Sequence, residues 1–149
     1  MVEDQVQKIA GIICGNRYDS QWGNSDSNVD FFDAKADVEA LLALSKNVYA
    51  FEEAEHPALQ LGQTAKITKN NKVIGWIGAL SPSLQKALSM PNAFLFEINQ
   101  DDIEDGEIAC YEPFSSFQAS QRDIAIVVAK EISADQLINS IKSLKQDDL

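Results

Sequence analysis

Apolar residues follow strand-like and helix-like patterns by turns along the first part of the chain. Residues 8–15 form a short, apolar, β-branched run that stops at a glycine, which predicts a buried strand. From Asp33 the period changes, because apolar residues recur at helical spacing from Val38 to Leu42. Asp33 is well placed to accept the first free backbone N–H groups as the N-cap. These patterns predict a strand, then the polar loop 16–28, then a helix.

Three more strands are predicted in the middle of the chain. Val48–Ala54 has a strand pattern, and residues 65–69 and 72–78 read as two strands joined by Asn70-Asn71. Asparagine tolerates positive φ, so this pair suits a tight hairpin turn. Gly75 lies inside one of these strands, as does Gly78, and close packing of neighbouring backbones explains them better than phosphate binding.

A short helix and a last strand complete this part. Ser81-Pro82 combines a capping hydroxyl with a proline at the first helical position, which predicts a short helix that ends near Met90-Pro91. Phe94–Ile98 is again strand-like. The acidic run 101–107 is interpreted as a solvated turn or a short helix, since its spacing is not that of a calcium loop.

The part of the chain from Tyr111 onward looks like a separate unit. Asp123–Ala129 predicts a fully apolar strand, and Ser133–Gln136 is a capping-box pattern that opens a helix with Leu137 and Ile141 on one side. One strand and one helix cannot close a core. Either this unit packs on the preceding domain, or the chain ends before its partner strands.

Composition narrows the classes of function. The 149 residues are 45% hydrophobic and carry a formal charge of −11, which excludes a mainly disordered chain and disfavours nucleic-acid binding through the overall field. Two cysteines and one histidine are too few for the usual four-ligand structural zinc site. Glu3 and Asp4 do not suit a signal peptide, and no apolar run is long enough to span a membrane, so we expect a cytoplasmic protein with reduced thiols. One disulfide in an exported protein is the alternative.

Few side chains suggest catalysis or phosphate binding. His56 precedes Pro57, and a structural turn explains the pair better than a catalytic histidine. No phosphate-binding glycine motif occurs, and the only arginines are Arg17 and Arg122. Arg122 is predicted to pair with Asp123 at the entry of the apolar strand, with ligand contact as the alternative. Tyr18 and Trp22, the large rings of the polar loop, are expected to fold back and cap the core.

Several segments together resemble the C-terminal part of the bacterial phenylalanyl-tRNA synthetase β subunit. The collinear segments are 9–17 with Trp22, 29–42, 56–58 with Gly62-Gln63, 74–82, 95–97, and Ser116-Phe117 leading to 122–128. Each is weak alone, but together they run from about residue 9 to 130. Three positions depart from the family pattern: Ala36 and Leu61, which are of little consequence, and Gln118, which stands where a proline usually follows Phe117 at the entry into the second part.

The resemblance implies an α+β fold in two parts. Residues 1–112 would form a non-catalytic synthetase-like domain, with the class II antiparallel sheet and flanking helices. Residues 113–149 would begin a ferredoxin-fold anticodon-binding domain, as a partial β-α unit. The chain is then expected to be a fragment, with Met1 an expression start. The stretch Phe94–Ile103, at the apparent place of a class II ATP-binding arginine, offers acids such as Glu97 and Asp102, which would repel ATP.

The leading hypothesis is therefore a structural and subunit-interaction module of phenylalanyl-tRNA synthetase. The resemblance implies an assembly of two α and two β chains that uses ATP and Mg²⁺ to charge tRNA-Phe, while this chain alone carries no catalytic, cofactor or metal residues. Arg17, Trp22 and Arg122 are the candidate tRNA or subunit contacts, because they are exposed-type side chains in or beside loops. A free-standing tRNA-binding or editing factor is the alternative, although residues 114–149 hold four bases and five acids. An enzyme using Asp30, Asp33, Asp37 or Glu39 is a third, against which helix capping and solvation explain these acids.

Overall fold

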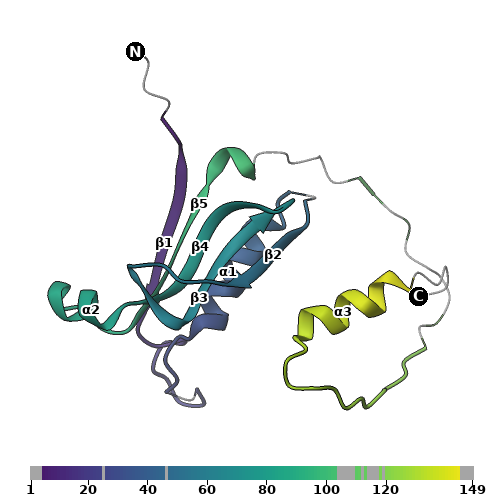
Figure 1. Cartoon of the computed structure of the whole chain (residues 1–149). Coiled ribbons are helices and arrows are strands. Elements are labelled where there is room, and N and C mark those ends of the chain that lie inside the picture. The colour runs from purple at the N-terminus through teal and green to yellow at the C-terminus, as the bar shows by residue number, and fades with distance from the viewer. Residues whose placement is uncertain are drawn as a thin grey trace. The chain divides into compact units, whose positions relative to one another are not determined.

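The chain divides into two compact units, Met1–Cys110 and Tyr111–Leu149. The computed structural model describes residues 5–24, 26–45, 47–103, 110–111, 113, 118 and 120–144. Figure 1 draws the sheet and helices of the first unit in purple to green, and the helix of the second unit in yellow.

The first unit is built on a five-stranded sheet in which every neighbouring pair is antiparallel. Across the sheet the strands are β1 (Lys8–Cys14), β5 (Ala93–Asn99), β4 (Lys72–Leu80), β3 (Leu59–Lys69) and β2 (Tyr49–Glu53). β5, which follows the other four strands in the sequence, thus lies between β1 and β4 in the sheet. The expected antiparallel sheet with accompanying helices, an α+β architecture, is confirmed.

Two helices connect strands of the sheet, and a short helical turn follows the last of these strands. Helix α1 (Phe31–Leu42) packs against the sheet, α2 (Pro82–Leu88) connects β4 to β5, and the 3₁₀ turn η1 (Gln100–Asp102) follows β5 (Figure 1). The acidic run at 101–107 thus begins in a short helical turn, while residues 104–107 lie outside the described part of the chain.

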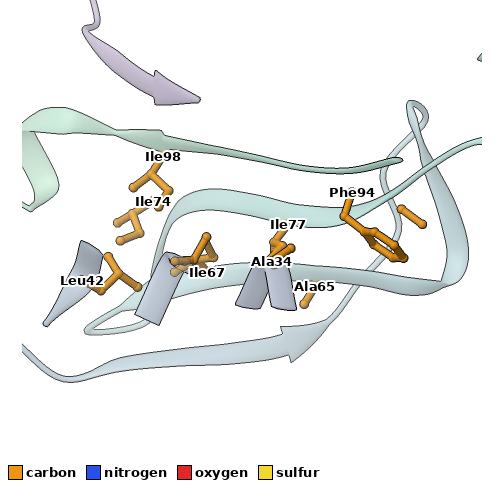
Figure 2. Close-up of a cluster of buried hydrophobic side chains, with 10 residues drawn as sticks. Ala34, Leu42, Ala65, Ile67, Ile74, Ile77, Phe94 and Ile98 are labelled. Atoms are coloured by element: carbon orange, nitrogen blue, oxygen red, sulfur yellow. The ribbon is translucent and has the colours of Figure 1, made fainter. Parts of the chain in front are cut away.

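The core lies between α1 and one face of the sheet. The α1 side chains Ala34, Val38 and Leu42 are buried, and Ile67 and Ile77 from the central strands are fully buried opposite them (Figure 2). The remaining members of this cluster are Ala65, Ile74, Ala79, Phe94 and Ile98. The apolar side chains that recur about every 3.6 residues along α1 therefore pack against those that alternate along the strands, and together they form a single apolar layer.

Two glycines allow the central strands to approach each other, as predicted. A Cβ atom at Gly75 would lie 2.4 Å from the carbonyl oxygen of Glu97, and one at Gly78 would lie 2.7 Å from that of Gln63. Any larger residue would push backbone away from backbone.

The hairpin between β3 and β4 also has the predicted turn. Asn70 and Asn71 both adopt left-handed backbone, with φ of 51° and 64°. Two consecutive residues with positive φ are the signature of a type I′ hairpin turn, whose twist matches that of the flanking strands.

The start of α1 differs from the prediction by three residues. Asp30, not Asp33, is the N-cap: its carboxylate accepts the backbone N–H groups of Phe32 at 2.8 Å and of Asp33 at 3.1 Å. Asp33 occupies the third helical position, and its carboxylate accepts the backbone N–H of Asp30 at 2.8 Å. The two aspartates form a reciprocal capping box, which satisfies the free N–H groups at the helix start.

Strand β1 is present but is not buried as predicted. Its residues alternate between half-buried and exposed, and Ile12 is 53% exposed. Among the described strands β1 pairs with β5 only, so it forms an edge of the sheet. An edge strand and a buried strand have the same β-branched composition, and the run alone did not separate them.

Helix α2 begins as predicted, with Ser81 at the N-cap and Pro82 at the first position. The Ser81 hydroxyl, however, makes no bond to the helix backbone and lies 3.1 Å from the hydroxyl of Ser83. The helix ends at Leu88, because Ser89 turns into left-handed backbone with a φ of 53°.

The second unit contains helix α3 (Ala134–Ser143). Its predicted capping box is confirmed, since Ser133 accepts the Gln136 N–H and the Gln136 side chain accepts the Ser133 N–H. The predicted strand at 123–129 is wrong: these residues are in irregular backbone, and Ile124 and Val127 are exposed. A strand needs a neighbour for its hydrogen bonds, and no described residue of this unit pairs with the segment.

Candidate functional site

The face of the sheet opposite α1 carries a transverse row of side chains, which we call the open-face row. The strand register places one residue of each strand directly beside the next, in the order Ala10, Glu97, Trp76, Lys66 and Glu52. Residues directly opposite in an antiparallel pair share a face of the sheet, so this row crosses all five strands.

The charges on this face are paired with one another. Lys8 Nζ lies 2.5 Å from Glu97 Oε1, and Lys66 Nζ lies 2.9 Å from Glu52 Oε2. The Thr68 hydroxyl also donates to Glu52, at 3.0 Å. The ammonium of Lys66, helped by this hydroxyl, lowers the pKa of Glu52 below its ordinary value. These groups therefore engage each other rather than a ligand.

His56 lies over Trp76 at the centre of this face. Their ring centroids are 5.0 Å apart and the planes are tilted by 48°. His56 Nδ1 accepts the backbone N–H of Ala58 at 3.3 Å, and its carbonyl accepts that of Leu59 at 3.0 Å, so the predicted structural His-Pro turn is confirmed. With the Nδ1 lone pair engaged, this imidazole is not poised as a general base through that nitrogen.

A hollow of about 290 Å³ adjoins this ring pair, lined by residues that include Lys8, Glu97 and Asn99. None of its lining residues is an arginine. Bidentate recognition of phosphate favours arginine, and the cations beside this hollow are lysines.

Two acids, one in β5 and one just after it, are paired with lysines. Asp102 lies 2.7 Å from Lys72 Nζ, and the Asp102 carbonyl accepts from Lys69 Nζ at 2.9 Å. The Lys72 ammonium lowers the pKa of Asp102. Together with the Lys8 contact of Glu97, these contacts pair two acids of the stretch Phe94–Ile103 with lysines, whereas Asp101 is exposed and forms no ion pair within the described ranges.

Loop 16–28, between β1 and α1, contains two of the sequence-predicted contact residues. Its base is closed by a β-bridge between Asn16 and Asn28 and by the Arg17 N–H, which donates to the Ser27 carbonyl at 2.8 Å. The loop therefore leaves the sheet and returns as a closed structure next to the start of α1.

Arg17 fastens this loop to the helix. Its Nε and Nη2 lie 3.0 and 2.8 Å from Asp33 Oδ2, and Nη2 also lies 3.0 Å from Asp30 Oδ2. The guanidinium lowers the pKa of Asp33, and Asp33 in turn raises the pKa of Arg17. Arg17 thus binds the capping box, and its charge is already satisfied within the fold.

The prediction that the loop aromatics cap the core is wrong. Trp22 is fully exposed and Tyr18 is 57% exposed. The turn that carries Trp22 is closed by the Asn24 N–H, which donates to the Gln21 carbonyl at 3.2 Å. Because the loop closes through its own backbone bonds, its rings need no core contact to hold its shape.

Arg122 belongs to the second unit, whereas Arg17 and Trp22 belong to the first. The predicted ion pair with Asp123 is absent, and Arg122 pairs with none of the residues that the structure describes. The acids of the third hypothesis are structural or solvated: Asp30 and Asp33 cap α1, and Glu39 pairs with Lys35 at 2.9 Å.

Sequence reasoning missed the open-face row. Part of the signal was present, because Lys66 stands between the apolar Ala65 and Ile67, which indicates a strand with two different faces. Finding the row required the strand register, since only that places Trp76 between Lys66 and Glu97.

Metal, redox and membrane features are few in the described chain. Cys14 and Cys110 are exposed and carry thiols rather than a disulfide. Within the described ranges, no His, Cys, Asp and Glu side chains gather in a group that could hold a metal ion. In the same part of the chain, no helix has the length and apolar character of a membrane span.

Comparison with known proteins decides the family. The profile of the phenylalanyl-tRNA synthetase beta chain CLM domain matches residues 3–100. The chain belongs to this family. The resemblance inferred from the sequence is thereby confirmed, and the matched range covers the whole sheet of this phenylalanyl-tRNA synthetase beta chain domain.

Individual relatives agree with the phenylalanyl-tRNA synthetase assignment. The chain is 38% identical over 141 residues to the phenylalanine–tRNA ligase beta subunit of Pseudomonas putida, and 38% identical over 147 residues to that of Nitrosococcus oceani. It is 37% identical over 142 residues to that of Coxiella burnetii. These alignments cover 93%, 96% and 93% of the chain. The chain spans 18% of the length of each relative.

Proposed function

We propose that this chain serves as a non-catalytic structural and subunit-interaction module of phenylalanine–tRNA ligase. The activity of the whole ligase, charging tRNA-Phe with phenylalanine by means of ATP and Mg²⁺, belongs in this proposal to an assembly of two α and two β chains in the cytoplasm. The first unit, within residues 1–112, corresponds to a class II synthetase-like domain. Residues 113–149 correspond to the start of a ferredoxin-fold anticodon-binding domain.

One observation carries the non-catalytic part of the proposal: the family's sheet is present, but its described open face has no arginine. Lys8, Lys66 and Lys72 on or beside this face are each engaged by a carboxylate within the fold. A site that stabilises phosphate charge in a transition state needs donors aimed at the ligand and not already satisfied. The geometry therefore favours a supporting role over chemistry.

The test is phenylalanine-dependent exchange between ATP and pyrophosphate. It is run on the chain alone, on purified α subunit with full-length β subunit, and on that pair with the chain in excess. We expect no exchange from the chain alone and inhibition of the pair, because the chain competes for a subunit surface. Exchange by the chain alone, free of contaminating synthetase, contradicts the non-catalytic assignment.

A further inference from the structure

Trp22 is presented to solvent at the tip of loop 16–28. It stands in the turn Gln21–Asn24, and Gly23 supplies the left-handed backbone of that turn with a φ of 98°. The exposed fraction of Trp22 is 104%, the largest among the exposed hydrophobic residues of the described chain. A tryptophan offers a large, rigid contact area. A ring left wholly in water does not contribute the stabilising free energy that its burial would give.

The tip stands on a well-fastened base. The Arg17 and Val29 N–H groups donate to the carbonyls of Ser27 and Gly15 at 2.8 and 3.0 Å, and the Arg17 side chain binds Asp30 and Asp33. Ordering such a loop on binding therefore requires little further loss of conformational freedom. Preorganisation of this kind, around an exposed aromatic anchor, is typical of protein docking elements.

The charges around the tip indicate the kind of partner. Asp19 and Asp26 are exposed, and neither carboxylate forms an ion pair with a residue in the described ranges. The one arginine of the loop is already bound by Asp30 and Asp33. Unpaired carboxylates on both sides of the ring are repelled by the phosphates of an RNA backbone. They are complementary to a basic protein surface.

We propose that loop 16–28 is a docking element whose Trp22 ring enters an apolar pocket with a rim of lysine or arginine on the α subunit. The inference rests on the proposed function, since it names the part of the module that makes the subunit contact. Trp22 is the anchor, Asp19 and Asp26 steer the encounter, and Arg17 holds the loop in place. Of the two sequence-predicted contact residues in this loop, Trp22 contacts the partner, and Arg17 positions the loop that carries Trp22.

The first test measures the affinity of purified α subunit for full-length β subunit carrying this segment, by surface binding. We expect Trp22→Ala to raise the dissociation constant by roughly 30-fold or more, as a central aromatic anchor does. Val48→Ala is the matched control, because Val48 is also exposed, at 86%, but lies away from the loop. It should leave the affinity unchanged.

Charge is tested separately. Neutralising both loop acids, Asp19→Asn with Asp26→Asn, should lower the association rate constant and weaken its dependence on salt, because steering acts on encounter. The affinity of the assembled ligase for tRNA-Phe should be the same for all these variants. A loss of tRNA affinity with unchanged subunit affinity overturns the proposal and makes the loop an RNA contact.

A local probe follows the docking directly. The chain has two tryptophans, so Trp76→Phe leaves Trp22 as the only indole. Its emission should shift to shorter wavelength when α subunit is added, as water leaves the ring. An unshifted spectrum on a formed complex, or a Trp22→Ala variant that binds as well as wild type, overturns this inference and leaves the proposed function standing. Failure of the wild-type pair to associate overturns the proposed function itself.

Discussion

The Arg17 guanidinium meets one oxygen of Asp33 through two nitrogens, at 3.0 and 2.8 Å. Asp33 also closes the capping box of α1, so this contact joins the loop to the helix start. An interaction of this geometry depends on the planar fork of arginine, which lysine cannot reproduce.

Replacing Arg17 should destabilise the first unit in a pH-dependent way. The pKa of Asp33 is lower in the folded chain than in the unfolded one, so the contact stabilises the fold above the unfolded value. This stability is lost as pH falls through the lowered pKa. Urea unfolding should therefore show a difference between wild type and Arg17→Ala at pH 7 that shrinks below about pH 4. Arg17→Lys should recover only part of it, and a difference independent of pH would contradict this account.

The N-cap assignment is tested at Asp30. Asp30→Ala removes the acceptor for the Phe32 and Asp33 N–H groups and should lower the free energy of unfolding by about 1 kcal/mol. Asp30→Ser, which keeps a capping oxygen, should lower it less. Equal losses for both variants in thermal unfolding would show that capping is not what Asp30 contributes.

The core between α1 and the sheet is tested on β4. Ile77 is fully buried, so Ile77→Ala should lower the free energy of unfolding by about 2–5 kcal/mol, through lost burial and the cavity left behind. Val73 on the same strand is 41% exposed, and Val73→Thr should change it by about 0.5 kcal/mol or less. Chemical denaturation measures both, and similar effects would place the core elsewhere.

The close approach of β4 and β5 is tested at Gly75. Gly75→Ala should lower the free energy of unfolding by about 1–3 kcal/mol, because its methyl group meets the Glu97 carbonyl oxygen in the neighbouring backbone. Gly11→Ala is the matched control: its methyl group meets the ring of Phe96, a side chain that can rotate away. A smaller effect at Gly75 than at Gly11, in the same denaturation experiment, is the result that contradicts the argument.

Local signals in the sequence predicted the strands of the sheet, a hairpin turn and a helix cap. The Asn70-Asn71 turn and the Ser133–Gln136 capping box were identified correctly, because their geometry is set by the residues themselves. The sequence places the start of α1 three residues late, because Asp30 and Asp33 are both able to cap and only the backbone shows that Asp30 is the N-cap. Local patterns predict local geometry, but they do not decide which of two neighbouring aspartates caps the helix.

Features that depend on distant partners were predicted less well. β1 has the composition of a buried strand yet lies at an edge, and 123–129 has the composition of a strand without a neighbour to pair with. Trp22 was expected to cover the core because burial favours large rings, but the loop closes through backbone bonds that leave the ring outside. Tertiary arrangement decided each of these, and no run of residues encodes it alone.

The lysine contacts at Asp102 have a mechanical consequence. Lys69 and Lys72 flank the Asn70-Asn71 turn and grip Asp102 just past the end of β5. Tension on the chain beyond Ile103 is therefore passed into the tip of the β3–β4 hairpin before it reaches the hydrogen bonds of β5. β5 is itself hydrogen-bonded to β1 on one side and to β4 on the other, so the end of the first unit is held by the lysine contacts and by two neighbouring strands. A pull that releases these two ammonium groups should come before any strand is drawn from the sheet.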